Sequence, residues 1–321
     1  MASGREHTLR EWDLDQACAL QTLSGLTDRI EQISLSPDGR TLLTASRAGG
    51  VRFWEAATGR LIGHLSVRGR FAEVSPNGKQ LAIGITDGVV LLYSFPPGGE
   101  PLRQLTTNFH RVMSAQFSPD SRLLAIRGDH PIAQVWDLGS DKLVASLLHD
   151  ERVPSVVFFP DGQNFDVVVT GLAFSPDGQR LATGSQDGLL RLWTLGGKDL
   201  RILRAHEGAV NALGFVGTTH MVSAGADGLI KVWNLLTGQS VLTYKRQLPY
   251  VSRLAVSPDG KRLASTSDHD LKIWELETGI DLLSLKPDIR LEQTILFSPD
   301  NLHLAAAGFD GVRIWRATTE E

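Results

Sequence analysis

The chain lacks the residue patterns that carry catalysis in common enzyme families. It contains no His-Glu-x-x-His or Cys-x-x-Cys pair, no Gly-x-Ser-x-Gly motif around a nucleophile and no Gly-x-x-x-x-Gly-Lys-Ser/Thr phosphate loop. Its nine histidines are scattered, and most aspartates lie in turns, where backbone preferences explain them. The sequence therefore predicts no catalytic residue, no metal site and no cofactor. An active site assembled by converging loops is the alternative that a linear pattern does not reveal.

Arginines offer a different chemistry. Five of them stand immediately before short apolar runs, and two follow such runs: Arg29, Arg70, Arg111, Arg152 and Arg290, then Arg47 and Arg127. The guanidinium group presents a planar set of donors that fits carboxylates and phosphates. These residues could therefore recognise an acidic group, provided that the fold brings them together.

Composition indicates a soluble globular protein. The 321 residues are 42% hydrophobic and 21% charged, and the formal net charge of −4 gives no general case for binding nucleic acid or an anionic membrane. The lone Cys18 excludes an internal disulfide and favours a reducing compartment. No apolar run is long enough to span a bilayer, and residues 1–15 lack the apolar core of a signal peptide. We expect a cytoplasmic protein without a membrane partner.

An aromatic residue ends a strand-like segment at a regular period. These residues are Trp12, Trp54, Tyr93, Trp136, Trp193, Trp233, Trp274 and Trp315, separated by 42, 39, 43, 57, 40, 41 and 41 residues. Apart from the single gap of 57, this is the period of roughly 40–45 residues that is typical of one blade of a β-propeller.

Turn motifs recur within each period. Ser-Pro-Asp-Gly stands at 36–39, 175–178 and 257–260, with close variants at 75–78, 118–121 and 298–301. Asp-Gly follows at 87–88, 187–188, 227–228 and 310–311. Such dipeptides favour tight turns and hairpins. The segments between them predict four short antiparallel strands in each repeat, and no segment has helical periodicity. The sequence therefore predicts an all-β fold.

The gap of 57 residues contains a duplicated segment. Residues 153–162 resemble residues 169–178, so the first strand of this blade is present twice. We interpret one copy as part of the sheet and the segment near 153–168 as a surface insertion. The alternative is the remnant of a blade that lost its middle strands.

The two ends of the chain complement each other. The last repeat stops after its third strand, and residues 16–23 have the pattern of a fourth strand. An N-terminal outer strand on the last blade would close the ring and remove its free edges. We expect a single seven-bladed β-propeller over residues 1–321, made of four-stranded antiparallel blades. Their approximate bounds are 29–66, 67–108, 109–148, 151–204, 206–244, 249–286, and 289–317 plus 16–23.

Residues 174–193, which read FSPDGQRLATGSQDGLLRLW, resemble a WD repeat, and related copies cover almost the whole chain. The repeats resemble the bacterial-style WD repeats found in C-terminal propellers of multidomain signalling proteins. One blade resembles the structural hydrogen-bond tetrad of the family at all four positions: His206, Ser223, Asp227 and Trp233. Around Thr183, Asp187 and Trp193 the pattern is partial, because no histidine is nearby in the sequence.

The resemblance also implies where the arginines lie. In the family, the loops before the first strand and between the second and third strands line one rim of the ring. A collar would then combine the seven arginines with two aromatic residues, Tyr250 and Phe309. The alternative is that these arginines are solvated side chains without a role in binding.

The resulting prediction is a non-catalytic, monomeric scaffold or sensor module in a larger signalling or regulatory assembly. Its rim would bind an acidic protein or peptide. The second hypothesis is a nucleic-acid-binding module that uses the arginine collar, and it predicts a steep loss of affinity with added salt.

Overall fold

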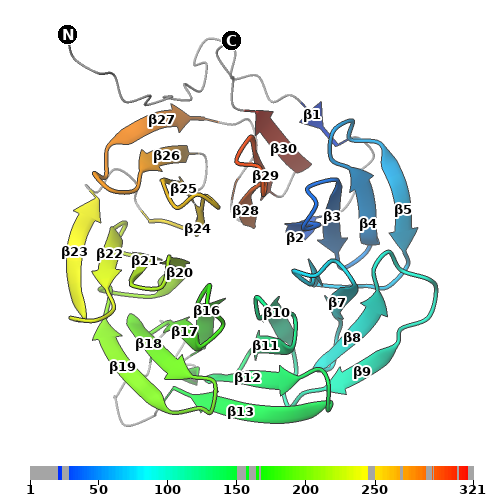
Figure 1. Ribbon diagram of the computed structural model, residues 1–321, viewed down its shortest axis with the longest axis horizontal. Helices are drawn as coiled ribbons and strands as arrows, with labels where there is room; N and C mark the ends of the chain where they lie inside the picture. The colour runs from blue at the N-terminus through cyan, green and yellow to red at the C-terminus, as the bar shows by residue number, and fades with distance from the viewer. Residues whose placement is uncertain are drawn as a thin grey trace.

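Seven four-stranded antiparallel sheets surround a common axis (Figure 1). The computed structural model describes residues 21–23, 29–149, 157–158, 164–165, 168–244, 250–267, 270–286, 291, 293–308 and 311–316, and these form strands and turns without a helix. Each sheet is one blade, whose first strand lies nearest the axis and whose fourth strand lies at the circumference. The predicted all-β, seven-bladed propeller is confirmed.

Blades 1 to 4 follow one another along the chain. Blade 1 contains β2 (Ile30–Leu35), β3 (Thr41–Ser46), β4 (Gly50–Glu55) and β5 (Leu61–Leu65). Blade 2 contains β6 (Phe71–Val74), β7 (Gln80–Gly84), β8 (Val89–Ser94) and β9 (Arg103–Thr106). Blade 3 contains β10 (Val112–Phe117), β11 (Leu123–Gly128), β12 (Ile132–Asp137) and β13 (Lys142–Leu148). Blade 4 contains β16 (Val169–Phe174), β17 (Arg180–Ser185), β18 (Leu189–Thr194) and β19 (Asp199–Arg204).

Blades 5 to 7 complete the circle. Blade 5 contains β20 (Val210–Val216), β21 (His220–Gly225), β22 (Ile230–Asn234) and β23 (Gln239–Tyr244). Blade 6 contains β24 (Arg253–Val256), β25 (Arg262–Thr266), β26 (Leu271–Glu275) and β27 (Asp281–Leu285). Blade 7 contains β28 (Thr294–Phe297), β29 (His303–Gly308), β30 (Gly311–Arg316) and the N-terminal strand β1 (Gln21–Thr22).

Strand β1 closes the ring. It pairs antiparallel with β30, placing Gln21 opposite Ile314 and Thr22 opposite Arg313. In Figure 1 the blue β1 lies beside the red β30, so the two ends of the chain share one sheet. The predicted outer strand of the last blade is therefore confirmed in its described part. Residues 16–20 lie outside the described residues.

The duplicated segment forms a sheet of its own. Its described residues are β14 (Val157–Phe158) and β15 (Asn164–Phe165), which pair with each other and with no blade. The second copy supplies β16, the innermost strand of blade 4.

The Ser-Pro-Asp-Gly turns owe their shape to their serine and aspartate side chains. In blade 1, Ser36 Oγ donates to Asp38 Oδ1 (2.5 Å) and accepts from the backbone N of Thr41 (2.9 Å). The last turn residue adopts a positive φ, 71° at Gly39, which favours glycine. Ser121 and Asn301 hold the same position in the variant turns at φ of 63° and 61°.

Apolar side chains between the blades form seven buried clusters, one at each junction. A blade is a sheet with two apolar faces, so it depends on both neighbours for burial. The junction between blades 7 and 1, called the seam below, contains Leu23, which follows β1 and is 3% exposed.

The role of the seam in ring closure predicts that a leucine-to-alanine substitution lowers the free energy of unfolding more at the seam than on the surface. Leu23→Ala should lower the free energy of unfolding by about 2–4 kcal/mol, because it leaves a void at the seam. Leu102→Ala, at a leucine that is 63% exposed, should change it by less than about 0.5 kcal/mol. Urea denaturation followed by tryptophan fluorescence measures both. Equal effects of the two substitutions would contradict this account of closure.

Candidate functional site

Four of the predicted arginines lie on one stretch of rim. Arg29 and Arg47 belong to blade 1, Arg70 precedes blade 2 and Arg111 precedes blade 3. Because successive strands run in opposite directions, the loop before a first strand and the turn after a second strand reach the same rim. We call these four residues the arginine sector.

Glu31 supplies a carboxylate to the arginine sector. Glu31 Oε1 lies 2.9 Å from Arg47 Nε and 3.8 Å from Arg29 Nε. Arg70 is close enough to these charged groups for its pKa to depend on them. Burial lowers its pKa first, the neighbouring Arg47, Arg111 and Arg29 lower it further, and Glu31 raises it. The four guanidinium groups are therefore close enough to one another to interact electrostatically on this part of the rim.

An exposed sulfur adjoins the charges. Arg70 Nη1 lies 3.1 Å from Met113 Sδ, and Met113 is 37% exposed although it lies on the inner strand β10. The arginine sector therefore offers charged donors beside a polarizable apolar side chain, and thioethers adapt easily to different partners.

Arg127 does not belong to a rim loop, so the predicted placement was wrong. Strand β11 extends to Gly128 and holds Arg127 half-buried between blades 3 and 4, where its Nη1 donates to Val169 O (3.2 Å). Burial lowers the pKa of Arg127 to about 10, and the nearby Arg253 contributes in the same direction. The apolar run before Arg127 gave no sign that the strand continues past it.

Of the remaining predicted rim residues, the structure describes Tyr250. Tyr250 is half-buried in the loop before β24. Arg152, Arg290 and Phe309 lie outside the described residues. Their membership of a complete collar stays a prediction.

The four tetrad side chains of blade 5 lie within hydrogen-bond distance of one another. His206 Nδ1 lies 2.9 Å from Asp227 Oδ1, and its Nε2 lies 2.8 Å from Ser223 Oγ, which also accepts from Trp233 Nε1 (2.9 Å). Burial lowers the pKa of His206, and the Asp227 carboxylate offsets part of this effect. The chain of bonds gives each buried polar group a partner, which avoids the cost of leaving it unpaired.

Blade 4 has a histidine that the sequence did not reveal. His149 Nε2 lies 2.7 Å from Thr183 Oγ1, which accepts from Trp193 Nε1 (2.7 Å). No histidine is near Thr183 in the sequence, because the inserted segment separates His149 from Thr183 by 34 residues instead of the 17 found in blade 5. The duplication itself was the signal that could have located it.

His149 is also held by a buried cation. Arg191, 1% exposed, places Nη1 2.6 Å from His149 Nδ1 and lies 4.0 Å from Asp187. Burial and then Arg191 lower the pKa of His149 to about 3. The imidazole is therefore neutral, with Nδ1 as acceptor and Nε2 as donor.

In blades 1, 3 and 6 the blade tryptophan forms a hydrogen bond with a polar side chain of its own blade. Trp54 Nε1 donates to Thr44 Oγ1 (3.0 Å) and Trp274 Nε1 donates to Ser265 Oγ (2.8 Å), while Trp136 Nε1 reaches Gln134 Oε1 (3.3 Å). Within the described ranges, no group of three histidine, cysteine, aspartate or glutamate side chains is placed to hold a metal ion. No helix in that part of the chain is long and apolar enough to cross a membrane.

A closed ring of four-stranded blades with these turns and tetrads defines a β-propeller built from repeats. The family model of the WD domain, G-beta repeat, matches residues 18–55, 164–194, 197–234 and 238–275. Together with the propeller fold, these matches show that the chain belongs to the WD-repeat β-propeller family.

Several curated proteins are similar to the chain. Guanine nucleotide-binding protein subunit beta of Oryza sativa subsp. japonica is 25% identical over 271 residues, which cover 78% of this chain and 68% of that protein. Apoptotic protease-activating factor 1 of Mus musculus is 23% identical over 267 residues, covering 82% and 20%. Actin-interacting protein 1-2 of Arabidopsis thaliana is 28% identical over 229 residues, covering 68% and 34%.

The blade 4 tetrad predicts a specific pH dependence. The pKa of His149 is about 3 in the folded protein and ordinarily 6.5, so between these values the unfolded chain binds a proton that the folded protein does not. The free energy of unfolding should therefore fall by about 1.4 kcal/mol for each pH unit below about 6.5 on account of this residue. His149→Gln should remove that contribution and flatten the pH profile, measured by urea denaturation.

The exposed His110 provides the control. His110→Gln makes the same change of side chain at an exposed position, where it breaks no buried hydrogen bond. A His149→Gln profile as steep as the wild type down to about pH 4.5 would contradict a neutral, buried imidazole.

Proposed function

We propose that the protein is a non-catalytic interaction module whose arginine sector binds an acidic peptide or protein segment. One observation carries this proposal: Arg29, Arg47 and Arg111 all lie close enough to Arg70 to lower its pKa, so four guanidinium groups are gathered on one stretch of rim. Like charges at this spacing repel one another, so a partner carboxylate relieves repulsion as well as forming new bonds. The arginines of three blades are held by a rigid ring, which limits the entropy lost on binding.

Glu31 restricts the chemistry of the partner. It occupies Arg47 and lies near Arg29, leaving Arg70 and Arg111 as the principal contacts for an incoming carboxylate. Met113 beside Arg70 favours an apolar side chain next to that carboxylate. A peptide segment combines both groups more readily than a nucleic-acid backbone does.

The names of the similar proteins support a protein partner. One is a subunit of a guanine nucleotide-binding protein, one activates a protease and one interacts with actin. By analogy, we propose that this propeller is a cytoplasmic scaffold or sensor unit of a larger signalling or regulatory assembly, and that the isolated propeller is a monomer. The tetrad residues of blade 5 would then stabilise the fold without contacting the partner.

Charge reversal in the arginine sector tests the proposal. The double variant Arg70→Glu/Arg111→Glu should retain the fold and lose at least about tenfold in affinity for the partner captured from source-cell lysate. Lys79→Glu/Lys198→Glu makes the same change in charge at exposed turns of the opposite rim and should bind as the wild type does. Pull-downs with all three proteins, analysed for protein and for nucleic acid, give the comparison.

The captured material decides between the hypotheses. Acidic protein lost only from the Arg70→Glu/Arg111→Glu sample supports the proposal. Nucleic acid lost from that sample, with a steep salt dependence, would replace it with the second hypothesis. Partners retained by a folded Arg70→Glu/Arg111→Glu variant would refute a role for the arginine sector.

A further inference from the structure

Side chains of four consecutive blades cap equivalent backbone carbonyls around the axis. The carbonyls lie at or just before the start of the next innermost strand, at Val169, Val210, Val251 and Gln293, which are 41, 41 and 42 residues apart. In the same order, the donors are Arg127 Nη1 (3.2 Å), Thr170 Oγ1, Asn211 Nδ2 (2.8 Å) and Arg253 Nε (2.7 Å). Each bond gives an edge carbonyl of one blade a partner on the blade before it.

Two of these four donors carry a charge that the bond does not require. Thr170 and Asn211 show that a neutral hydroxyl or amide is sufficient at this place. Arg127 and Arg253 use a guanidinium group instead, which has five N–H donors and is always charged. A partly enclosed charge costs free energy unless an opposite charge accompanies it. The two arginines therefore indicate a role beyond the bond between blades.

The two guanidinium groups lie near each other, although blades 4 and 5 separate their blades around the ring (Figure 1). Arg253 is close enough to Arg127 to lower its pKa, in addition to the larger effect of burial. Both side chains are half-buried, and both lie toward the rim of the arginine sector, since Arg253 begins β24 and Arg127 is the last residue but one of β11. A bound anion would relieve the repulsion between them.

Carboxylates of the described residues do not neutralise Arg127. The described innermost strands carry Glu31 and Glu73. Glu31 Oε1 lies 2.9 Å from Arg47 Nε, and burial raises the pKa of Glu73 to about 8, so that Glu73 is mostly uncharged at pH 7. Asp129, two residues after Arg127, accepts from two backbone N–H groups of the loop before β10. No described carboxylate contributes to the pKa of Arg127.

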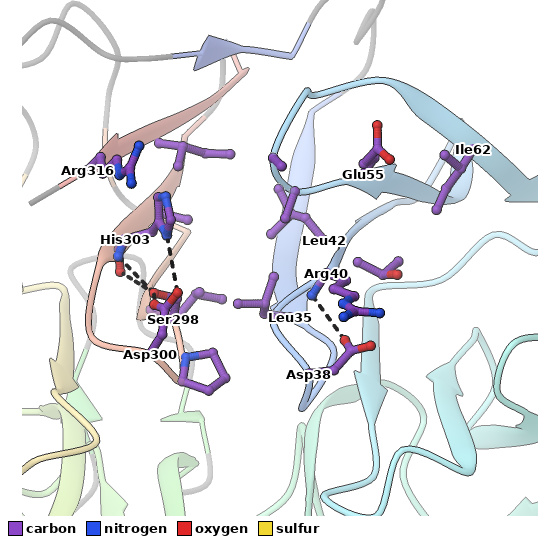
Figure 2. Close-up of a pocket in the computed structure, with 18 residues that line it drawn as sticks. Leu35, Asp38, Arg40, Leu42, Glu55, Ile62, Ser298, Asp300, His303 and Arg316 are labelled. Carbon is purple, nitrogen blue, oxygen red and sulfur yellow. Dashed lines mark hydrogen bonds and ion pairs between the residues drawn. The ribbon is translucent and has the colours of Figure 1, made fainter.

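The opposite rim differs, because its cations lie beside carboxylates. Figure 2 shows this rim at the seam, where side chains of both charges line a pocket of about 960 Å³. Asp38 and Glu55 line it together with Arg40, and Asp300 Oδ2 lies 3.8 Å from His303 Nδ1. An anion would meet both signs of charge there, so this pocket is not a comparable site.

We propose that Arg127 and Arg253 together bind a phosphate group, supplied by inorganic phosphate or by a small phosphate ester. A phosphate ester carries a charge of about −1.5 to −2 at pH 7, which matches two guanidinium groups better than the single charge of a carboxylate does. Its three terminal oxygens can accept from both arginines while each arginine keeps its bond to a backbone carbonyl. The site goes beyond the proposed function, because it needs neither a protein partner nor the arginine sector.

Isothermal titration calorimetry of the full chain tests the site. The probes are inorganic phosphate, glycerol 2-phosphate and acetate, compared in chloride buffer at one ionic strength. At least one phosphate probe should bind saturably with a dissociation constant below about 1 mM, and acetate should bind at least about tenfold more weakly. Binding of inorganic phosphate assigns the free anion, and binding of glycerol 2-phosphate alone assigns an ester.

Arg127→Gln/Arg253→Gln is the most selective variant. Glutamine keeps an N–H donor for each carbonyl, as Asn211 does in blade 5, but it removes both charges. The variant should bind the phosphate probe at least about tenfold more weakly, while its melting temperature in phosphate-free buffer stays the same or rises. Arg127→Gln alone should weaken binding at least about threefold, so the test does not depend on folding of the double variant.

Two controls isolate the site. Arg60→Gln/Arg122→Gln removes the same charges at exposed turns of the opposite rim and should bind phosphate as the wild type does. Arg70→Glu/Arg111→Glu should still bind phosphate saturably, which separates failure of this site from failure of the arginine sector.

Three results would overturn the proposal. The first is a wild type that shows no saturable binding of either phosphate probe up to about 10 mM. The second is a folded Arg127→Gln/Arg253→Gln or Arg127→Gln variant that binds phosphate as the wild type does. The third is equal affinity for acetate and phosphate.

Discussion

Burial of two apolar faces for every blade is the constraint on which the structure depends. A four-stranded sheet with side chains packed on both sides is stable in water only between two neighbours. The last blade must therefore pack against the first. Strand β1, near the start of the sequence, completes the last blade by pairing with β30, near its end. The seven junction clusters are consequences of that closure, and each contains side chains from two adjacent blades.

Because the blades form a closed ring, loops from different repeats lie side by side on one rim. Residues far apart in the sequence, such as Arg29 and Arg111, reach one stretch of rim because each lies at the start of an innermost strand. Buried polar side chains form hydrogen-bond networks within the blades. The most unusual network is in blade 4, where Arg191 is almost completely buried beside His149 and Asp187.

Much of the fold follows from the sequence because its signals are local. The Ser-Pro-Asp-Gly turns and the periodic tryptophans set strand lengths, and the unfinished last repeat predicts the outer strand that contains Gln21 and Thr22. The residues of the site were harder to place from the sequence. Arg127 was misplaced because the end of β11 has no marking residue, and His149 was missed because an insertion changed its spacing to Thr183.

The central claim is that a partner contacts the rim that carries the arginine sector. Amide hydrogen exchange of the full chain, with and without the protein partner captured from source cells, tests it most directly. The account predicts slower exchange in the loops at 47–49, 67–70 and 107–111, with the outer strands β13, β19 and β23 unchanged. Slower exchange confined to those outer strands, with the three loops unaffected, would contradict it.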